Sequence, residues 1–482
     1  MTCKPRFKPA AYVLLGSFPL SIGQLAAAPL DLQQQVVTAT RTAQTAQQSL
    51  AAVTVIDRER IERSQASSLP ELLKQVPGVS LANNGGPGKS SSIFLRGTES
   101  DHVLMLIDGV RFGSATSGSP SISDIPVDHI ERIEIVRGPR SSLYGSDALG
   151  GVIQIFTRRG APGAAVPSLL LGGGNLGSAR AELGLRGSVG NGWYGIGLAG
   201  RSTDGIDVRP SLNEPDNDGY RNLSGSLRGG WRFDNGAELS ASWLRAQGEN
   251  EFDGASQNET ESTIQVLGTH FSFSPLARWK LKLSAGQSRD HADNLLNGEF
   301  VSNFDTTREH YSLQNDLRLA RGHMLIVGAD FLRDEVDSTT PYPVRSRENT
   351  AGFAQYQARL GVHELQVSAR HDDNEQFGSK VTGGLAWGYR FGTGLRLTTA
   401  WGTAFKAPTF NELYFPNFGN PDLEPEESRS AEIALRGLLA DVRWGVSVFR
   451  TEIDELIAYD ASIQAPSNID EAVIRGVELD AG

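Results

Sequence analysis

After an N-terminal region, the sequence alternates apolar and polar side chains with a period of two residues, and this pattern constrains the fold most. In residues 380–391, Val381, Leu385 and Trp387 share one face of the predicted strand, whereas Lys380 lies on the other. The alternation recurs in residues 222–233 and 279–285. The pattern predicts a large antiparallel sheet with one apolar and one polar face.

The connections between the predicted strands are of two kinds. A short turn at residues 234–236 contrasts with long polar stretches at 204–220, 247–262 and 334–348. Short turns at one end and long loops at the other are typical of a transmembrane barrel. A soluble β-sandwich is the alternative, but it has no need for Trp and Tyr at its strand ends.

The membrane environment dictates how such a sheet must end. In hydrocarbon every backbone amide needs a hydrogen-bond partner, so a spanning sheet has to close on itself. The sequence stops in the middle of the alternating pattern, at residues 477–482. We therefore expect residues 161–482 to be an all-β transmembrane antiparallel barrel that is truncated at its C-terminus.

The N-terminus predicts export from the cytoplasm. Positive charges in residues 4–8 precede an apolar stretch at 10–25 and three alanines at 26–28, which is typical of a signal peptide over residues 1–28. Cys3, the only cysteine, lies within it, so we expect neither a disulfide nor a thiolate metal site in the mature chain. The net charge of -11 disfavours nucleic acid as a partner.

Between signal and barrel the pattern indicates two further regions. Residues 29–48 are polar and predict a flexible arm. Residues 49–160 predict a compact mixed α/β domain, in which Asp57 caps one helix and a second helix covers residues 69–76. Asp108-Gly109 predicts a tight turn between two of its strands.

One motif suggests an enzyme but lacks the required context. Residues 172–177 match the glycine spacing of a dinucleotide-binding fingerprint, yet an alternating strand follows where a helix is needed. The sequence has no zinc-protease motif and no nucleophile elbow. We expect no enzymatic activity.

Several motifs in order resemble those of the TonB-dependent outer-membrane receptors. They lie at residues 72–79, 94–97, 107–110, 133–139, 144–153, 405–408, 412–414 and 419–426. The resemblance implies an outer-membrane barrel of about 22 strands when complete, with an N-terminal plug domain in its lumen. Within the family, residues 84–86, 91–94, 102–104, 137–141 and 144–147 are most similar to receptors for cobalamin (vitamin B12).

The resemblance implies active transport of cobalamin into the periplasm, powered through TonB and its inner-membrane energising complex. A siderophore or haem receptor of the same family is the first alternative, and a passive porin or adhesin barrel is the second. We expect a monomer whose outer wall contacts outer-membrane lipid.

The arm carries a segment that resembles the family's TonB box, namely Gln35, Val36, Val37, Thr38 and Ala39. A segment of this kind can add itself as a strand to the edge of a sheet in a partner. A plain linker is the alternative.

An acidic set in two predicted external loops suggests a metal site. Its members are Asp207, Glu214, Asp216, Asp218 and Asp253, the first four of which match calcium-binding positions of the family. Calcium prefers six to eight oxygen ligands. An EF-hand is excluded because its twelfth position would be Gly225, and a solvated acidic loop remains the alternative.

Two further sets follow from the resemblance. The ligand-binding set on the plug loops is Ser90, Ser92, Glu99, Thr116 and Ser117, whose hydrogen-bonding side chains suit a large amide-bearing ligand. The plug-barrel charge cluster is Arg96 and Arg137 of the plug with Glu432 and Glu478 of the barrel. A plain loop and ordinary solvation of the lumen are the respective alternatives.

Overall fold

A computed structural model describes residues 36–37, 40–160, 162–210, 216–392, 394–439 and 442–481. The predicted signal peptide, Gln35, Thr38, Ala39 and Glu214 lie outside these residues. No helix among the described residues is long and apolar enough to cross a membrane.

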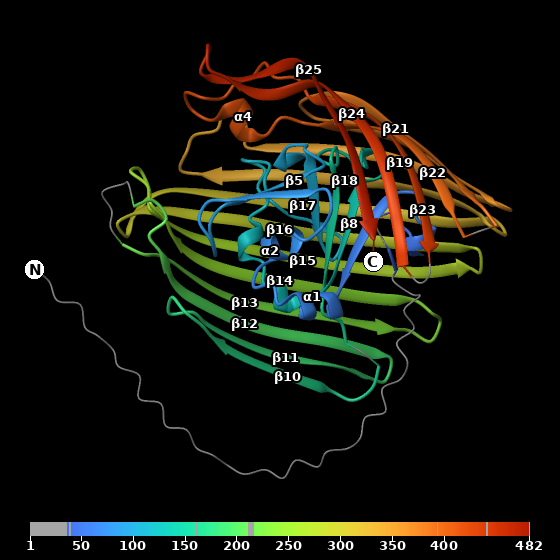
Figure 1. The fold of residues 1–482 in the computed structure, drawn as a ribbon, viewed down its shortest axis with the longest axis horizontal. Helices are drawn as coiled ribbons and strands as arrows, with labels where there is room; N and C mark the ends of the chain where they lie inside the picture. The colour runs from blue at the N-terminus through green and yellow to red at the C-terminus, as the bar shows by residue number, and fades with distance from the viewer. Residues whose placement is uncertain are drawn as a thin grey trace, which may run out of the picture.

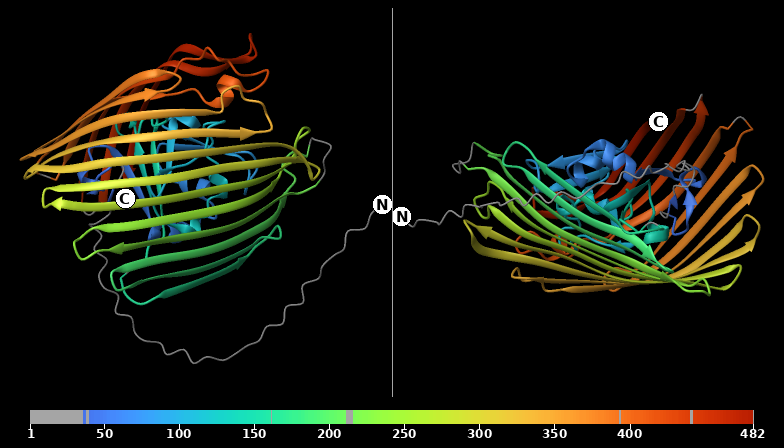
Figure 2. Two further views of the ribbon diagram at one scale, coloured as in Figure 1. Left: turned by 180° about the vertical axis from the view of Figure 1, so that it is seen from behind. Right: turned by 90° about the horizontal axis from the view of Figure 1, so that it is seen from below.

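Sixteen strands form one antiparallel sheet in sequence order, from β10 to β25. They are β10 (Val166–Gly173), β11 (Ala179–Val189), β12 (Gly192–Ile206), β13 (Asp218–Arg232), β14 (Glu238–Glu251), β15 (Glu259–Leu276), β16 (Trp279–Leu296), β17 (Glu299–Ala320), β18 (His323–Ser338), β19 (Ser346–Leu360), β20 (His363–Asn374), β21 (Gly378–Arg390), β22 (Arg396–Lys406), β23 (Glu426–Leu439), β24 (Val442–Asp460) and β25 (Ala465–Ala481). The sheet curves around the N-terminal domain (Figure 2). The long connection before β23 contains helix α4 (Phe410–Tyr414).

The distribution of side chains across this sheet is the reverse of that in a soluble protein. Val381 is 74% exposed on the outer face, while its neighbour Thr382 is 3% exposed on the inner face. Asp372 of β20 is completely buried against the plug. An apolar exterior and a polar interior fit a barrel wall in lipid, because lumen-facing and lipid-facing positions alternate along each strand.

The plug lies inside the curve of the sheet (Figure 1). Its main sheet has the order β3 (Ala52–Asp57), β8 (Ile130–Arg137), β9 (Gly151–Thr157), β6 (Val103–Ile107) and β7 (Val110–Arg111), with β6 and β9 parallel. A hairpin of β4 (Val79–Asn83) and β5 (Ser91–Leu95) stands beside it. The short helices are α1 (Arg58–Ser64), α2 (Leu69–Leu73), α3 (Ser141–Tyr144), η1 (Ala46–Gln48), η2 (Ser100–His102), η3 (Ile122–Asp124) and η4 (Val127–His129). The predicted fold class, an antiparallel barrel with a mixed plug, is confirmed.

Local predictions in the plug were mostly accurate. The Asp57 carboxylate accepts a hydrogen bond from the Arg60 amide at 2.9 Å and caps α1. Asp108 and Gly109 both have positive φ and form the turn between β6 and β7. The predicted helix over residues 69–76 is wrong at its end, because α2 stops at Leu73 and tighter turns lead into Pro77.

The described part of the arm is held against the barrel rather than free. Strand β1 (Val36–Val37) pairs antiparallel with β2 (Gln44–Thr45). The Arg396 guanidinium donates hydrogen bonds to the carbonyl oxygens of Gln48 (3.2 Å) and Ser49 (3.0 Å). Gln48 and Ser49 therefore lie beside the start of β22, at the end of the sheet where the strands are joined by short turns.

Candidate functional site

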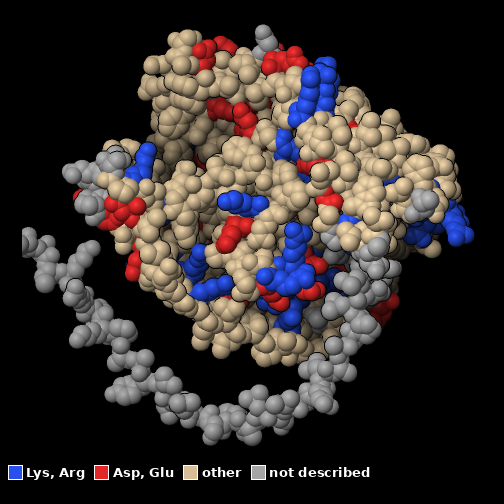
Figure 3. Space-filling view, viewed as in Figure 1, with Lys and Arg blue, Asp and Glu red and all other residues tan. Residues whose placement is uncertain are grey.

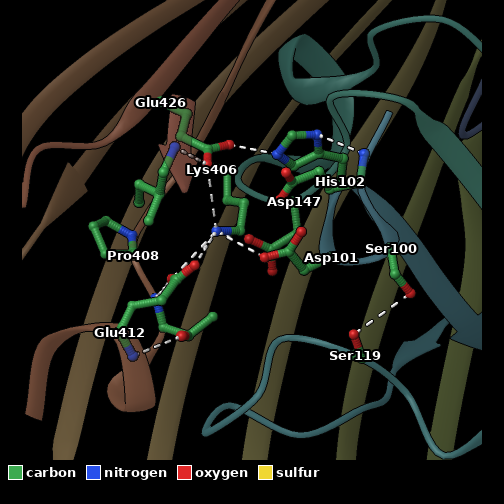
Figure 4. A network of polar contacts seen from close by, with 12 residues as sticks. Ser100, Asp101, His102, Ser119, Asp147, Lys406, Pro408, Glu412 and Glu426 are labelled. Carbon is green, nitrogen blue, oxygen red and sulfur yellow. Dashed lines mark hydrogen bonds and ion pairs between the residues drawn. The ribbon is translucent and has the colours of Figure 1, made fainter. Parts of the chain in front are cut away.

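Of the predicted ligand-binding residues, Ser92 lies in β5 and the other four lie on plug loops, which touch the long connections of the barrel. The Asn411 amide of α4 donates a hydrogen bond to the Thr116 carbonyl oxygen at 3.0 Å. The loops of Glu99 and Ser117 are adjacent, since the Ser119 hydroxyl lies 3.5 Å from that of Ser100 (Figure 4). Ser90 and Ser117 are exposed, whereas Thr116 is buried and its hydroxyl pairs with Ser114 at 2.6 Å.

Two glycines let the plug hairpin approach the barrel loops closely. A Cβ at Gly88 would lie 2.0 Å from the Tyr220 ring, and a Cβ at Gly85 would lie 2.4 Å from Val208. Both glycines also have φ in the region that other residues avoid. The loop before Ser90 is thus seated directly on the barrel segment that carries the acidic set.

Three of the five predicted metal ligands come together. Carboxylate oxygens of Asp207, Asp218 and Asp253 lie within 4.8 Å of one another. The amides of Val208 and Arg209 donate hydrogen bonds to Asp218 (2.7 Å) and Asp253 (2.6 Å) and orient their carboxylates. Asp216 is described but is not one of the three, and Glu214 lies outside the described residues.

Lys89, which sequence reasoning missed, joins the plug loop to this acidic set. Its ammonium donates hydrogen bonds to the carbonyl oxygens of Asp218 (3.1 Å) and Gly219 (3.3 Å) and to Asn250 Oδ1 (2.9 Å). Burial lowers the pKa of Lys89, while the nearby carboxylates, including that of Asp253, oppose the shift. The buried ammonium of Lys89 therefore holds the plug loop before Ser90 beside the barrel segment that carries the acidic set.

The structure brings together all four residues of the predicted plug-barrel charge cluster. Arg96 contacts Glu432 at 2.6 Å and Glu478 at 2.8 Å, and Arg137 lies 3.4 Å from Glu478. The Arg96 guanidinium also stacks on the Phe449 ring at 4.2 Å. The two arginine side chains are about 95% buried, so loss of their carboxylate partners on β23 and β25 would leave uncompensated buried charges.

A second plug-barrel network centres on Lys406, which is completely enclosed (Figure 4). Its ammonium lies 2.9 Å from Asp101 of the plug, 3.4 Å from Glu412 and 3.8 Å from Glu426. The His102 imidazole bonds to Glu426 as well. Burial lowers the pKa of His102, but the carboxylates of Glu426 and Asp101 together outweigh burial and raise that pKa overall. The sequence motifs at residues 405–408 and 419–426 include Lys406 and Glu426, but they do not indicate the plug residues that these two side chains contact.

Arg41 anchors the arm just after the predicted TonB box. Its guanidinium forms a double hydrogen bond with Asp330 of β18, at 2.7 and 3.1 Å, and stacks on Phe353 at 4.2 Å. Its carbonyl oxygen accepts hydrogen bonds from Lys282 (3.0 Å) and Gln314 (2.9 Å). Figure 3 shows Lys, Arg, Asp and Glu side chains gathered on the plug, in the region where Figure 1 labels α1 and α2.

Replacing Arg41 with Gln is expected to loosen the arm. The charged hydrogen bonds to Asp330 are lost, at a cost of about 1.5–3 kcal/mol, while Asp330 keeps its contact with Arg370 at 2.5 Å. Hydrogen exchange of the amides in residues 40–48 should accelerate by about tenfold or more. The control Arg63→Gln removes an exposed pair with Glu59 and should leave that exchange unchanged, and equal protection in both variants would refute the anchor.

Comparison with known proteins identifies both domains. The family model "TonB dependent receptor-like, beta-barrel" matches residues 194–482, and "TonB-dependent Receptor Plug Domain" matches residues 45–152. The chain is 37% identical over 459 residues to the vitamin B12 transporter BtuB of Photobacterium profundum, covering 93% of this chain and 75% of that relative. It is 34% identical over 502 residues to BtuB of Vibrio cholerae serotype O1 (strain M66-2), covering 98% and 79%.

Solved structures share the fold at lower identity. The siderophore receptor PirA from Acinetobacter baumannii superposes with a TM-score of 0.75 at 18% identity, covering 89% of this chain and 78% of that one. The ferric yersiniabactin uptake receptor FyuA from Yersinia pestis gives 0.72 at 19% identity, covering 90% and 76%. At such identities the likeness concerns the fold alone.

Proposed function

Because the chain belongs to the TonB-dependent receptor family and resides in the outer membrane, we propose that it carries cobalamin from the cell surface into the periplasm. The supporting observation is identity of 34–37% with vitamin B12 transporters over nearly the whole chain. The siderophore receptors among the solved structures are only 18–20% identical. This difference favours cobalamin over a siderophore or haem.

Transport requires energy from outside the outer membrane, which holds no ion gradient of its own. The potential across the inner membrane supplies about 2.3 kcal/mol per charge per 100 mV. The family implies TonB as the partner that delivers this energy. We infer that Val36, Val37 and the adjoining residues are the segment that TonB grips, because a strand added through main-chain hydrogen bonds transmits a pull along the backbone.

The acidic set fits a calcium ion as a structural cofactor. The Oδ1 atoms of Asp207 and Asp253 are buried and accept no hydrogen bond, although buried polar atoms rarely lack a partner. Carboxylate oxygens are the ligands that calcium prefers. A bound ion would neutralise the repulsion among Asp207, Asp218 and Asp253, and would order the loops beside the plug hairpin.

Replacing Asp253 with Asn is expected to remove the calcium dependence of ligand binding. The amide keeps the size of the carboxylate but loses its charge, so the site loses a strong ligand. Binding of cyanocobalamin to the purified receptor, measured with calcium and with chelator, should become about tenfold weaker in calcium and insensitive to chelator. The control Asp234→Asn, at a short turn, should retain the calcium response.

The same titration tests the ligand itself. Unmodified receptor should bind cyanocobalamin tightly, and more weakly once calcium is removed. No binding under either condition would overturn the assignment of cobalamin and favour a siderophore.

We further propose that the receptor acts as a monomer in contact with outer-membrane lipid, since its exposed apolar side chains follow the outer face of the sheet.

A further inference from the structure

A cavity separates the plug from one part of the barrel wall. It has a volume of about 210 Å³ and lies between plug elements β6, β7 and α3 on one side and strands β16–β20 on the other. Arg111 and Tyr144 line its plug side, and Ser284, Ser312 and Asn349 line its wall side. Hydrogen-bonding side chains thus surround most of the space.

This cavity occupies part of the height of the lumen. Lys282 lies near the start of β16, at the end of the short turns, and also lines the cavity. Asn374, another lining residue, is the last residue of β20 and precedes the connection of residues 375–377 at the opposite end of the strands. Arg41 of the arm lines the cavity too, where it holds Asp330.

A second cavity lies along the same wall on the other side of the arm. It has a volume of about 190 Å³ and is lined by Gln44 and Gln48 of the arm and by residues of β17–β20 near the short turns, such as His323 and Gln357. The two cavities therefore share strands β17–β20 and are both lined by the arm. Removing the arm would join them.

Other parts of the plug contact the sheet directly. Leu244, Ile264 and Val266 of β14 and β15 belong to the plug's own apolar core. Arg96 of the plug is paired with Glu432 of β23 and Glu478 of β25. The cavity beside Ser142 and β20–β23 has a volume of only about 40 Å³.

We propose that the transported molecule crosses the lumen along strands β16–β20, through a passage formed when TonB withdraws the arm and the two cavities join. This inference rests on the proposed function. At rest the passage is too small for a ligand the size of cobalamin, so the receptor does not leak. Arg111 of the plug and Lys282 and Arg370 of the wall line the cavity, and each is paired with a carboxylate, so the lining is rich in hydrogen-bonding groups that suit a ligand with amide and phosphate groups.

A bulky side chain in the cavity tests this route. Ser284→Trp would fill space on the wall of the passage, whereas Ser240→Trp places the same side chain on a lumen-facing position of β14 that does not line the cavities. Uptake of radiolabelled cyanocobalamin should fall by about tenfold or more in Ser284→Trp, equivalent to about 1.4 kcal/mol of added barrier. Binding at the cell surface should stay as in the parent, and uptake by Ser240→Trp should stay within about twofold.

Parent-level uptake in Ser284→Trp, or an equal loss in both variants, would overturn the route. If Ser284→Trp loses binding as well, Ser284→Cys and Ser240→Cys are compared before and after reaction with a bulky thiol reagent, because Cys3 is the only native cysteine. Only the reaction at position 284 should then block uptake. If the parent itself imports no cobalamin, the proposed function fails, and the inference fails with it.

Discussion

Replacing Val37 with proline is expected to abolish energised uptake of cobalamin while leaving its binding at the cell surface unchanged. Proline has no backbone N–H and cannot complete a strand added to a partner's sheet. We expect uptake to fall by about 100-fold. Each tenfold loss of rate corresponds to about 1.4 kcal/mol of added activation barrier. Two quantities are measured: the uptake of labelled cobalamin by cells, and the binding of labelled cobalamin to the cell surface at low temperature.

The matched control for this prediction is Val37→Ile, which keeps both the N–H and the preference for extended structure. It should transport as the parent does. Normal uptake in the proline variant would show that TonB does not engage this segment through its backbone.

Replacing Lys406 with Met is expected to destabilise the folded receptor by about 3–5 kcal/mol, because removal of a buried cation leaves its carboxylate partners uncompensated. Here those partners are Asp101, Glu412 and Glu426. Denaturant unfolding of the purified protein in detergent micelles measures the loss. The plug should also become more sensitive to protease.

An exposed lysine pair provides the comparison. Lys380 contacts Glu427 at 2.6 Å, but its side chain is 25% exposed and that of Glu427 is 52% exposed. Surface pairs contribute about 0–1 kcal/mol. Lys380→Met should therefore unfold almost as the parent does, and equal effects of the two substitutions would contradict the structural role of the Lys406 network.

Much of the architecture could be predicted because it depends on patterns among residues that are close together in the sequence. The alternation in residues 380–391 places Val381 outside and Thr382 inside whatever the neighbouring strands are. Asp57 acts as a helix cap through an amide only three residues away. Such features need no knowledge of the rest of the chain.

The contacts that join plug and barrel could not be found in this way. Lys89 reaches a carbonyl 129 residues away, and Arg41 reaches a carboxylate 289 residues away. In the sequence each is an isolated cation in a polar stretch. The Arg96 cluster was predicted only through its family resemblance, and burial of Thr116 depends on the packing of its loop against α4.

The central claim is that the protein is an energised cobalamin receptor, and the most direct measurement is uptake of labelled cyanocobalamin in otherwise identical cells with and without TonB. Cells that produce the receptor should accumulate the vitamin only when TonB is present, while surface binding should be the same in both strains. Accumulation that is independent of TonB, or the absence of binding in both strains, would contradict the account.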